Sequence, residues 1–156
     1  MSKSLKRVQA ALETLGIDSE VLEMSGETRT AQQAADEAGC DLDQIAKSVI
    51  FRGLVSGQAV LFLTAGGNQV ETELASAVAG ETLGKADAAL IRSQTGFAIG
   101  GVSPVGHLNP IRAFMDPRLL DFDVVYGAAG TPRHIFPVAP ELLREVTGAK
   151  VVAFVR

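Results

Sequence analysis

The strongest constraint on the fold is a segment that suits neither a helix nor a strand. Residues 95–107 read TGFAIGGVSPVGH, with four glycines and one proline. Glycine permits positive φ angles and close approach of other atoms, whereas proline fixes φ and removes a hydrogen-bond donor. We therefore expect a structured loop, called here the glycine-rich loop, that presents backbone N–H and C=O groups to whatever binds there.

The rest of the chain alternates between helical and strand-like patterns. Apolar residues recur at helical spacing over residues 4–15, and Thr30 with Gln33 forms a capping-box pattern that predicts a helix over residues 31–38. Residues 48–52 (SVIFR) and 59–64 (AVLFLT) have the β-branched and aromatic content typical of strands. Further helices are expected over residues 71–79, 87–95 and 140–147, and further strands over residues 21–23, 111–115, 123–127, 134–138 and 151–155.

This order of elements predicts a mixed α/β (α+β) fold. Strands and helices interleave irregularly, and several neighbouring strands are spaced as hairpins, so we expect a mixed sheet with helices around it and not a doubly wound sheet. A chain of 156 residues, 47% of them hydrophobic, is long enough for one domain over residues 1–156 with its own core. Without an apolar run of the ~20 residues that span a bilayer, and without a signal-peptide pattern, a cytoplasmic protein is expected.

Charge and cysteine content narrow the function classes. The net charge of −4 argues against a protein that coats DNA or RNA, although it leaves room for a local contact with one nucleic-acid end. Cys40 is the only cysteine, so an internal disulfide and a zinc cluster are excluded, and its acidic neighbours favour a small buried residue over a nucleophile. His107 and His134 are too far apart for a metal motif, so neither metal nor cofactor is predicted.

Few side chains are candidates for chemistry. Lys47 stands just before an apolar strand, where it is either an edge lysine or a cation at the mouth of a pocket. A second loop, residues 128–132 (AAGTP), would flank one cleft with the glycine-rich loop if their strands are neighbours. Ser103 lies outside a G-x-S-x-G elbow and precedes Pro104, which argues against a serine nucleophile. A site made of one lysine and backbone groups suits a reaction in which the substrate supplies part of the catalysis.

Three segments, taken together, resemble a known family. Residues 30–39 (TAQQAADEAG) are similar to a Thr-Ala-x-x-Ala-Ala helix, residues 45–51 (IAKSVIF) to a Lys-Ser-x-x-Phe strand, and residues 100–104 (GGVSP) to a Gly-x-x-x-Pro loop. These are motifs of the YbaK/ProX family of aminoacyl-tRNA editing domains, free-standing relatives of the insertion domain of bacterial prolyl-tRNA synthetase. Residues 127–136 (GAAGTPRHIF) also stand where the family would place them.

The resemblance implies a curved, barrel-like mixed sheet surrounded by helices. It also implies a trans-acting deacylase that hydrolyses the ester of a mischarged aminoacyl-tRNA, with the vicinal ribose hydroxyl of the substrate helping to activate water. Lys47 would contact the terminal nucleotide or the ester carbonyl. The backbone of residues 100–104, with Gly100 and Gly101 as its catalytic part, would hold the amine or carbonyl of the amino acid and help to place water. The residues that the resemblance suggests for substrate binding are Thr30, Val102, Ser103, Pro104, Gly106, Gly130, Thr131 and His134.

The expected partner is the acceptor end of an aminoacyl-tRNA, with an aminoacyl-tRNA synthetase as a further candidate; neither DNA nor a membrane is expected. The edited amino acid stays open among alanine, cysteine, serine and threonine, as does the oligomeric state. Two alternatives remain at this point. The chain could be a non-catalytic module that binds a tRNA end or a synthetase, or a small-molecule aminoacyl esterase that does not require tRNA.

Overall fold

A computed structural model describes residues 2–26 and 30–156 of the chain. Within them, eight strands form one sheet in the order β1-β7-β6-β2-β3-β5-β8, and β4 pairs with β2 outside this path. The strands are β1 (Leu22–Glu23), β2 (Ile45–Gly53), β3 (Ala59–Ala65), β4 (Leu83–Lys85), β5 (Arg112–Met115), β6 (Val125–Ala128), β7 (His134–Val138) and β8 (Lys150–Val151). The α-helices are α1 (Lys3–Thr14), α2 (Ala31–Ala38), α3 (Thr72–Ala79), α4 (Ala88–Thr95) and α5 (Pro140–Thr147), with 3₁₀ turns η1 (Leu42–Gln44) and η2 (Pro117–Asp121).

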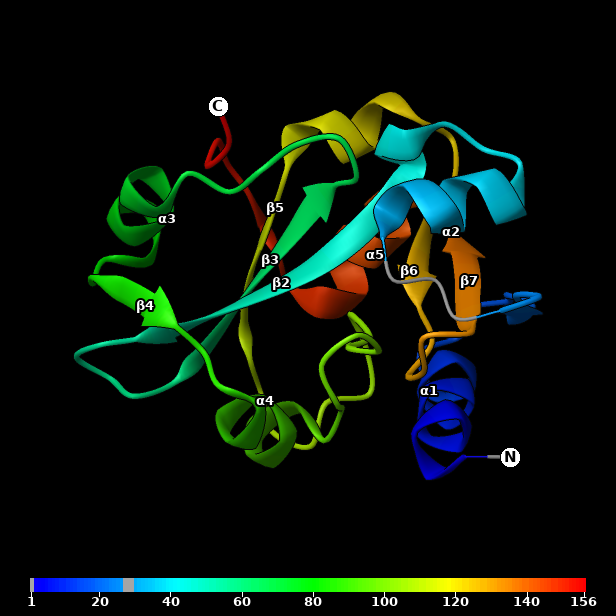
Figure 1. Cartoon of the computed structure of the whole chain (residues 1–156), viewed down its shortest axis with the longest axis horizontal. Helices are drawn as coiled ribbons and strands as arrows, with labels where there is room; N and C mark the ends of the chain where they lie inside the picture. The colour runs from blue at the N-terminus through cyan, green and yellow to red at the C-terminus, as the bar shows by residue number, and fades with distance from the viewer. Residues whose placement is uncertain (1, 27–29) are drawn as a thin grey trace.

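The sheet is mixed, as predicted, and open rather than closed into a barrel. β2 pairs antiparallel with β3 and parallel with β6, while β3 pairs parallel with β5. All seven residues of β3 are buried, which its unbroken apolar sequence requires because both faces of this strand are covered. The centre of the fold is therefore the β2–β3 pair, which runs across the middle of Figure 1.

Two layers of helix and loop cover the two faces of β3. Leu61 and Leu63 belong to a cluster that includes apolar residues of α1, α4, α5 and the glycine-rich loop. Val60 and Phe62 point to the opposite face and belong to a cluster with residues of α3 and Phe154. Figure 1 shows α3 and α1 at opposite ends of the molecule. No helix in the described part of the chain has the length and apolar character needed to cross a membrane.

Local signals in the sequence correctly predict the helix ends. The Thr30 hydroxyl accepts a hydrogen bond from the Gln33 N–H at 3.1 Å, and the Thr30 N–H donates to Gln33 Oε1 at 3.2 Å, so the capping box is confirmed. Gly39 ends α2 with a φ of +70°, in the left-handed region that glycine adopts without strain.

Two strands differ from the sequence-based prediction. β4 was not expected, because its three residues carry no local strand pattern; it forms through tertiary pairing of Leu83–Lys85 with the end of β2. The expected final strand over residues 151–155 is shorter, since only Lys150–Val151 pairs with β5. Beyond it, Val155 forms a single bridge to Val70, so the C-terminal residues cover the core without extending the ladder.

Phe62 gives a test of this core. Its ring is fully buried, and its centroid lies 5.7 Å from that of Phe51, 5.3 Å from Phe114 and 4.9 Å from Phe154. Phe62→Ala should lower the free energy of unfolding by about 3–5 kcal/mol, because it removes these contacts and leaves a cavity. Urea denaturation measures this, with Val55→Ala as the control, because Val55 is 85% exposed. Similar losses in both variants would contradict the assigned core.

Candidate functional site

A pocket lies where β2 has no strand partner on one edge. β6 pairs with β2 only at Ile45 and Ala46, and β4 pairs with it only at residues 51–53. Within the described residues, positions 47–50 therefore have β3 on one side and no strand on the other. A pocket of about 300 Å³ lies beside this open edge and is called here the Lys47 pocket. Its lining residues are Thr30, Ala31, Ala34, Ile45, Ala46, Lys47, Ser48, Val49, Gly100, Val102, Tyr126, Ala128, Thr131, His134 and Ile135.

Along its open edge, β2 points main-chain groups away from the sheet. Gly53 donates its N–H to Gln58, toward β3, while Leu54 donates to Thr82 on the opposite side. Because backbone direction alternates along a strand, Ser48 and Ile50 point their N–H and C=O groups away from β3, toward the open edge. The strand thus offers main-chain donors and acceptors at the pocket.

Lys47 is the only lysine or arginine among the described residues that line the pocket. Its Nζ donates a hydrogen bond to the Asn68 carbonyl at 2.6 Å, which ties the side chain to the turn after β3. Partial burial lowers the pKa of the Lys47 ammonium from its ordinary value, and the carboxylates of Asp116 and Asp43 oppose this shift. The lysine is therefore an anchored, half-buried cation, in accord with the interpretation that places it at the mouth of a pocket.

The two predicted loops pack backbone against backbone. A Cβ on Gly101 would lie 2.9 Å from the Thr131 Cα and 3.0 Å from the carbonyl carbon of Gly130. Gly130 has a φ of +92°, and a Cβ there would lie 2.7 Å from the Ser4 carbonyl oxygen of α1. Only glycine permits these approaches without a shift. Gly101 and Gly130 do not line the pocket; instead, they hold together the two loops that flank it.

Gly100, Val102, Thr131 and His134 meet around the pocket, together with Thr30 at the start of α2. Thr131 Oγ1 lies 2.7 Å from His134 Nδ1, and it also accepts the Arg133 N–H at 3.1 Å. The side chain of Thr131 thus fixes the conformation of the second loop. The hydroxyl of Thr30 caps α2, so this residue has a structural role whether or not it contacts a ligand.

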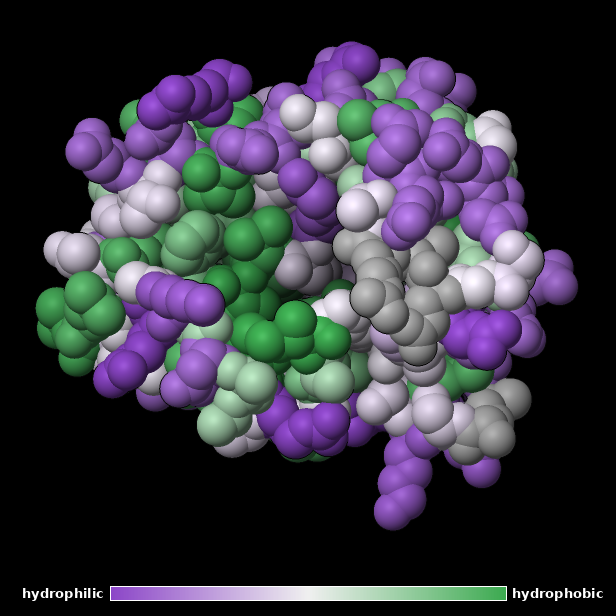
Figure 2. Space-filling model, in the orientation of Figure 1, coloured by the Kyte–Doolittle hydropathy of each residue, from purple (hydrophilic) through white to green (hydrophobic). Residues whose placement is uncertain are grey.

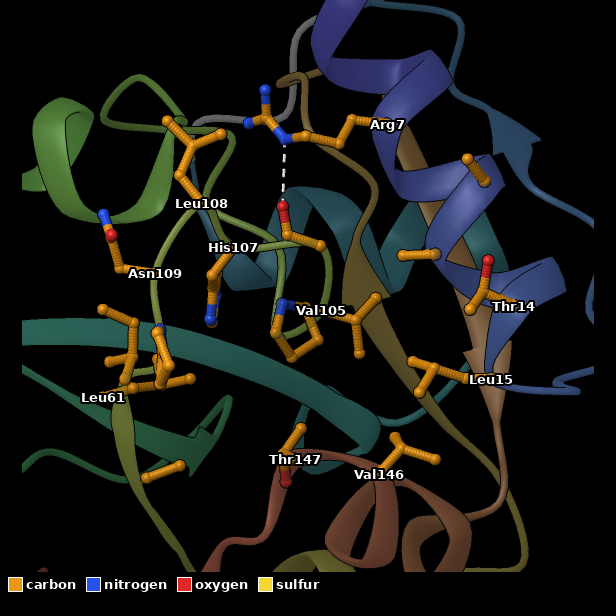
Figure 3. Close-up of a pocket in the computed structure, with 17 residues that line it drawn as sticks. Arg7, Thr14, Leu15, Leu61, Val105, His107, Leu108, Asn109, Val146 and Thr147 are labelled. Carbon is orange, nitrogen blue, oxygen red and sulfur yellow. Dashed lines mark hydrogen bonds between the residues drawn. The ribbon is translucent and has the colours of Figure 1, made fainter.

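Three other predicted binding residues lie elsewhere in the glycine-rich loop. Ser103 is fully buried, and its Oγ accepts the Val105 N–H at 3.1 Å, which is a structural role. Pro104 and Gly106 line a second cavity of about 660 Å³ between α1, α5 and residues 104–111, shown in Figure 3. One loop therefore lines the Lys47 pocket with its first half and this second cavity with its second half.

Arg7 fixes the glycine-rich loop from the α1 side. Its Nε donates to the Gly106 carbonyl at 2.9 Å, drawn as a dashed line in Figure 3, and its terminal nitrogen donates to the Gly96 carbonyl at 2.7 Å. His107 also lies in this cavity, where Nε2 is 2.7 Å from the Ser103 carbonyl oxygen. Burial lowers the pKa of the His107 imidazole, the Ser103 carbonyl opposes this shift, and Arg7 adds to it. Neither residue lines the Lys47 pocket.

Two polar residues of the pocket wall were not named as site residues from the sequence. Tyr126 lines the pocket from β6, and the Ser48 side-chain oxygen is buried without a hydrogen-bond partner among the described residues. A buried hydroxyl without a partner costs about 1–3 kcal/mol. Ser48 stands beside Lys47 in the Lys-Ser-x-x-Phe motif, which is the signal that could have found it, whereas Tyr126 reaches the pocket only through the pairing of β6 with β2. Cys40 is half-buried, and burial, followed by the charge of Asp41, raises the pKa of its thiol, which disfavours a thiolate.

The chemistry available at the pocket is limited. Its described lining residues include no aspartate, glutamate or cysteine. Within residues 2–26 and 30–156, no three His, Cys, Asp or Glu side chains are grouped so that they could hold a metal ion. What remains is one lysine, one histidine, hydroxyl groups and backbone dipoles, a set suited to binding a polar ligand and stabilising developing negative charge.

Gly101 provides a test of the loop contact. Gly101→Ala should lower the free energy of unfolding by about 1–3 kcal/mol, because its Cβ would meet the backbone of the second loop. The matched control is Gly26→Ala, since no atom of the non-adjacent described residues lies within 4 Å of its would-be Cβ and Gly26 does not have a positive φ. Thermal and urea unfolding measure both variants, and equal stability would contradict the close packing.

Ser48 provides a second test. Ser48→Ala removes a hydroxyl that has no hydrogen-bond partner among the described residues, so the unfolding free energy should stay the same or rise. The control is Ser103→Ala, whose free energy of unfolding should fall by about 1 kcal/mol because the Ser103 hydroxyl accepts a buried hydrogen bond. A loss of stability in Ser48→Ala as large as that in Ser103→Ala would show that the Ser48 hydroxyl has a partner in the folded protein.

Known proteins are similar to this chain in sequence or in fold. The uncharacterized protein YwhH of Bacillus subtilis (strain 168) is 30% identical over 148 residues, which cover 95% of this chain and 94% of YwhH. A solved structure described as a candidate trans-editing enzyme for prolyl tRNA synthetase is 43% identical, with a TM-score of 0.93 and coverage of 100% of this chain and 99% of that one. The hypothetical protein APE2540 is 27% identical, with a TM-score of 0.87 and coverage of 96% and 99%.

The motifs noted in the sequence and the pocket they build agree with one family. Residues 25–146, which include Lys47, both loops and the whole wall of the Lys47 pocket, match the aminoacyl-tRNA editing domain. This chain belongs to the aminoacyl-tRNA editing domain family.

Proposed function

We propose that the protein is a trans-acting deacylase that hydrolyses the ester between a wrongly attached amino acid and the 3′ end of a tRNA. The observation that carries this proposal is the Lys47 pocket itself: a half-buried cation and the backbone of the glycine-rich loop face one small cavity in a chain of the editing family. The 43% identity to a candidate trans-editing enzyme for prolyl tRNA synthetase supports tRNA for proline as the substrate and that synthetase as a partner.

The size of the pocket supports a small substrate group. About 300 Å³ is at the low end of the range for small-molecule sites, and it suits a small amino acid with part of the terminal adenosine. The apolar part of the wall, which includes Ala31, Ala34 and Val102, can contact a small side chain. A hydrolytic site of this kind is useful because binding alone discriminates one methylene by only ~1–3 kcal/mol.

The lack of a carboxylate in the wall supports a mechanism that relies on the substrate. Water adds to the ester carbonyl, the bond to the ribose oxygen then breaks, and a proton passes to that oxygen, which leaves free amino acid and free tRNA. The vicinal ribose hydroxyl helps to activate the water, so the protein need not provide a general base. The main-chain N–H of Gly100, which lines the pocket, stabilises the oxyanion, a contribution worth about 3–4 kcal/mol per donor in other hydrolases. Gly101 acts indirectly, because its N–H donates to the Ala98 carbonyl and its backbone packs on the second loop.

The remaining residues have binding roles in this proposal. Lys47 contacts the terminal nucleotide or the ester carbonyl, and the Thr131–His134 pair contacts the amino acid or the ribose from the opposite loop. Ser103, Pro104 and Gly106 act indirectly, because they set the path of the loop that carries Gly100.

The decisive experiment measures release of amino acid from tRNA for proline that carries alanine, cysteine, serine or threonine. The wild-type protein should deacylate at least one of the four. Lys47→Ala should lower kcat/KM on that substrate by roughly tenfold to a thousandfold, because it removes the pocket's cation. Lys6→Ala, an exposed lysine on α1, is the matched control and should keep the wild-type rate.

Each outcome separates one alternative. Tight binding of the charged tRNAs without turnover would indicate a non-catalytic binding module. Equal hydrolysis of simple aminoacyl esters without tRNA would indicate a small-molecule esterase. Full activity of Lys47→Ala would remove Lys47 from the mechanism while leaving the deacylase assignment in place.

A further inference from the structure

One face of β2 carries a surface strip that extends beyond the Lys47 pocket. Alternation along the strand places Lys47, Val49 and Phe51 on the same face. Lys85 of β4 pairs directly with Phe51, so its side chain projects from that face as well. These four residues are called here the β2 strip, which begins at the Lys47 pocket and ends at an exposed lysine.

The strip is the uncovered margin of an apolar sheet face. α3 and the C-terminal residues cover this face over β3, where Val60 and Phe62 are fully buried. Over β2, by contrast, Val49 and Phe51 are only half-buried, although both pack against the same cluster. Figure 2 shows apolar surface gathered in a hollow over these central strands.

The strip is cationic at both ends and lacks acidic side chains of its own. Neither β2 nor β4 contains aspartate or glutamate, and Lys85 forms no ion pair with any described residue. The carboxylates of Asp116 and Asp43 act on Lys47, and Asp87 stands two residues after Lys85 in the chain. The chain as a whole has a net charge of −4, so the β2 strip, with a lysine at each end and apolar side chains between them, differs from the average surface of the protein.

These properties match the chemistry of single-stranded nucleic acid. Proteins bind such strands by combining cations for the phosphates with apolar and aromatic surface for the bases. Lys47 and Lys85 are separated by four strand positions, or roughly 13 Å at about 3.3 Å per residue. At about 3.4 Å per stacked nucleotide, this distance spans roughly four nucleotides.

We propose that the β2 strip binds the single-stranded 3′ segment of the tRNA immediately before the terminal adenosine. This inference rests on the proposed function, because it is the pocket at Lys47 that holds the terminal adenosine. Lys85 contacts a phosphate upstream, while Val49 and Phe51 contact the bases between. The strip thereby gives an acidic protein a local site for one RNA end without a broad basic surface.

The test uses an RNA hairpin that has a single-stranded ACCA 3′ end and carries no amino acid, together with the same hairpin with a blunt end. Fluorescence anisotropy at several salt concentrations gives the affinity of wild type, Lys85→Gln and Lys6→Gln. Lys85→Gln should weaken binding of the ACCA hairpin several-fold and reduce the slope of log K against log salt by about 0.7, the value for one phosphate contact on a single strand. Lys6→Gln removes the same charge from the α1 side and should leave both quantities at wild-type values.

Two outcomes would overturn the proposal. Equal affinities and slopes for Lys85→Gln and Lys6→Gln would show that Lys85 makes no phosphate contact. Equal weakening on the blunt hairpin would place the contact on duplex RNA rather than on the single strand. Because the hairpin carries no amino acid, the binding result does not depend on turnover. A wild-type protein that binds the hairpin through Lys85 but hydrolyses no aminoacyl ester would refute the proposed deacylase activity and leave the proposed RNA contact of the β2 strip in place.

Discussion

The functional features of this protein depend on how β2 is paired. One edge of the strand is bonded to β3 along seven consecutive positions, whereas the other edge is bonded only near its two ends, by β6 and β4. The full pairing keeps β2 rigid, and the gap on the other edge leaves main-chain groups and Lys47 beside a cavity. A continuous neighbour on both edges would fill the pocket, and no neighbour at all would leave the strand free to move.

The glycine-rich loop completes the pocket because it is held from several sides. Gly101 packs on the backbone of the second loop, and Arg7 of α1 binds carbonyl groups near both ends of the segment. A loop with this many glycines would otherwise have a large conformational entropy to lose on binding a substrate. These contacts preorganise the main chain at Gly100, which is the property that the proposed catalysis by backbone dipoles requires.

Much of this organisation could be predicted from the sequence, for reasons that are local. The capping box at Thr30, the glycine that ends α2 and the apolar run of β3 each depend on residues within one element, so their outcome is confirmed. The candidate site was predicted less completely. The motifs pointed to Lys47, Gly100, Thr131 and His134, which meet at one pocket. Ser48 was not named as a site residue although it stands in the Lys-Ser-x-x-Phe motif, and Tyr126 reaches the pocket only through the pairing of β6 with β2.

The sequence by itself determined the fold class, the family and the residue types at the site, because periodicity, caps and short motifs are properties of neighbouring residues. Only the tertiary structure decided which of those residues share a cavity. In the folded protein, Pro104 and Gly106 line the second cavity and Ser103 is buried within the loop. The three-residue strand β4 places Lys85 on the same face as Lys47. The physical reason is that strand register and loop packing depend on contacts between residues far apart in the chain, which no local pattern records.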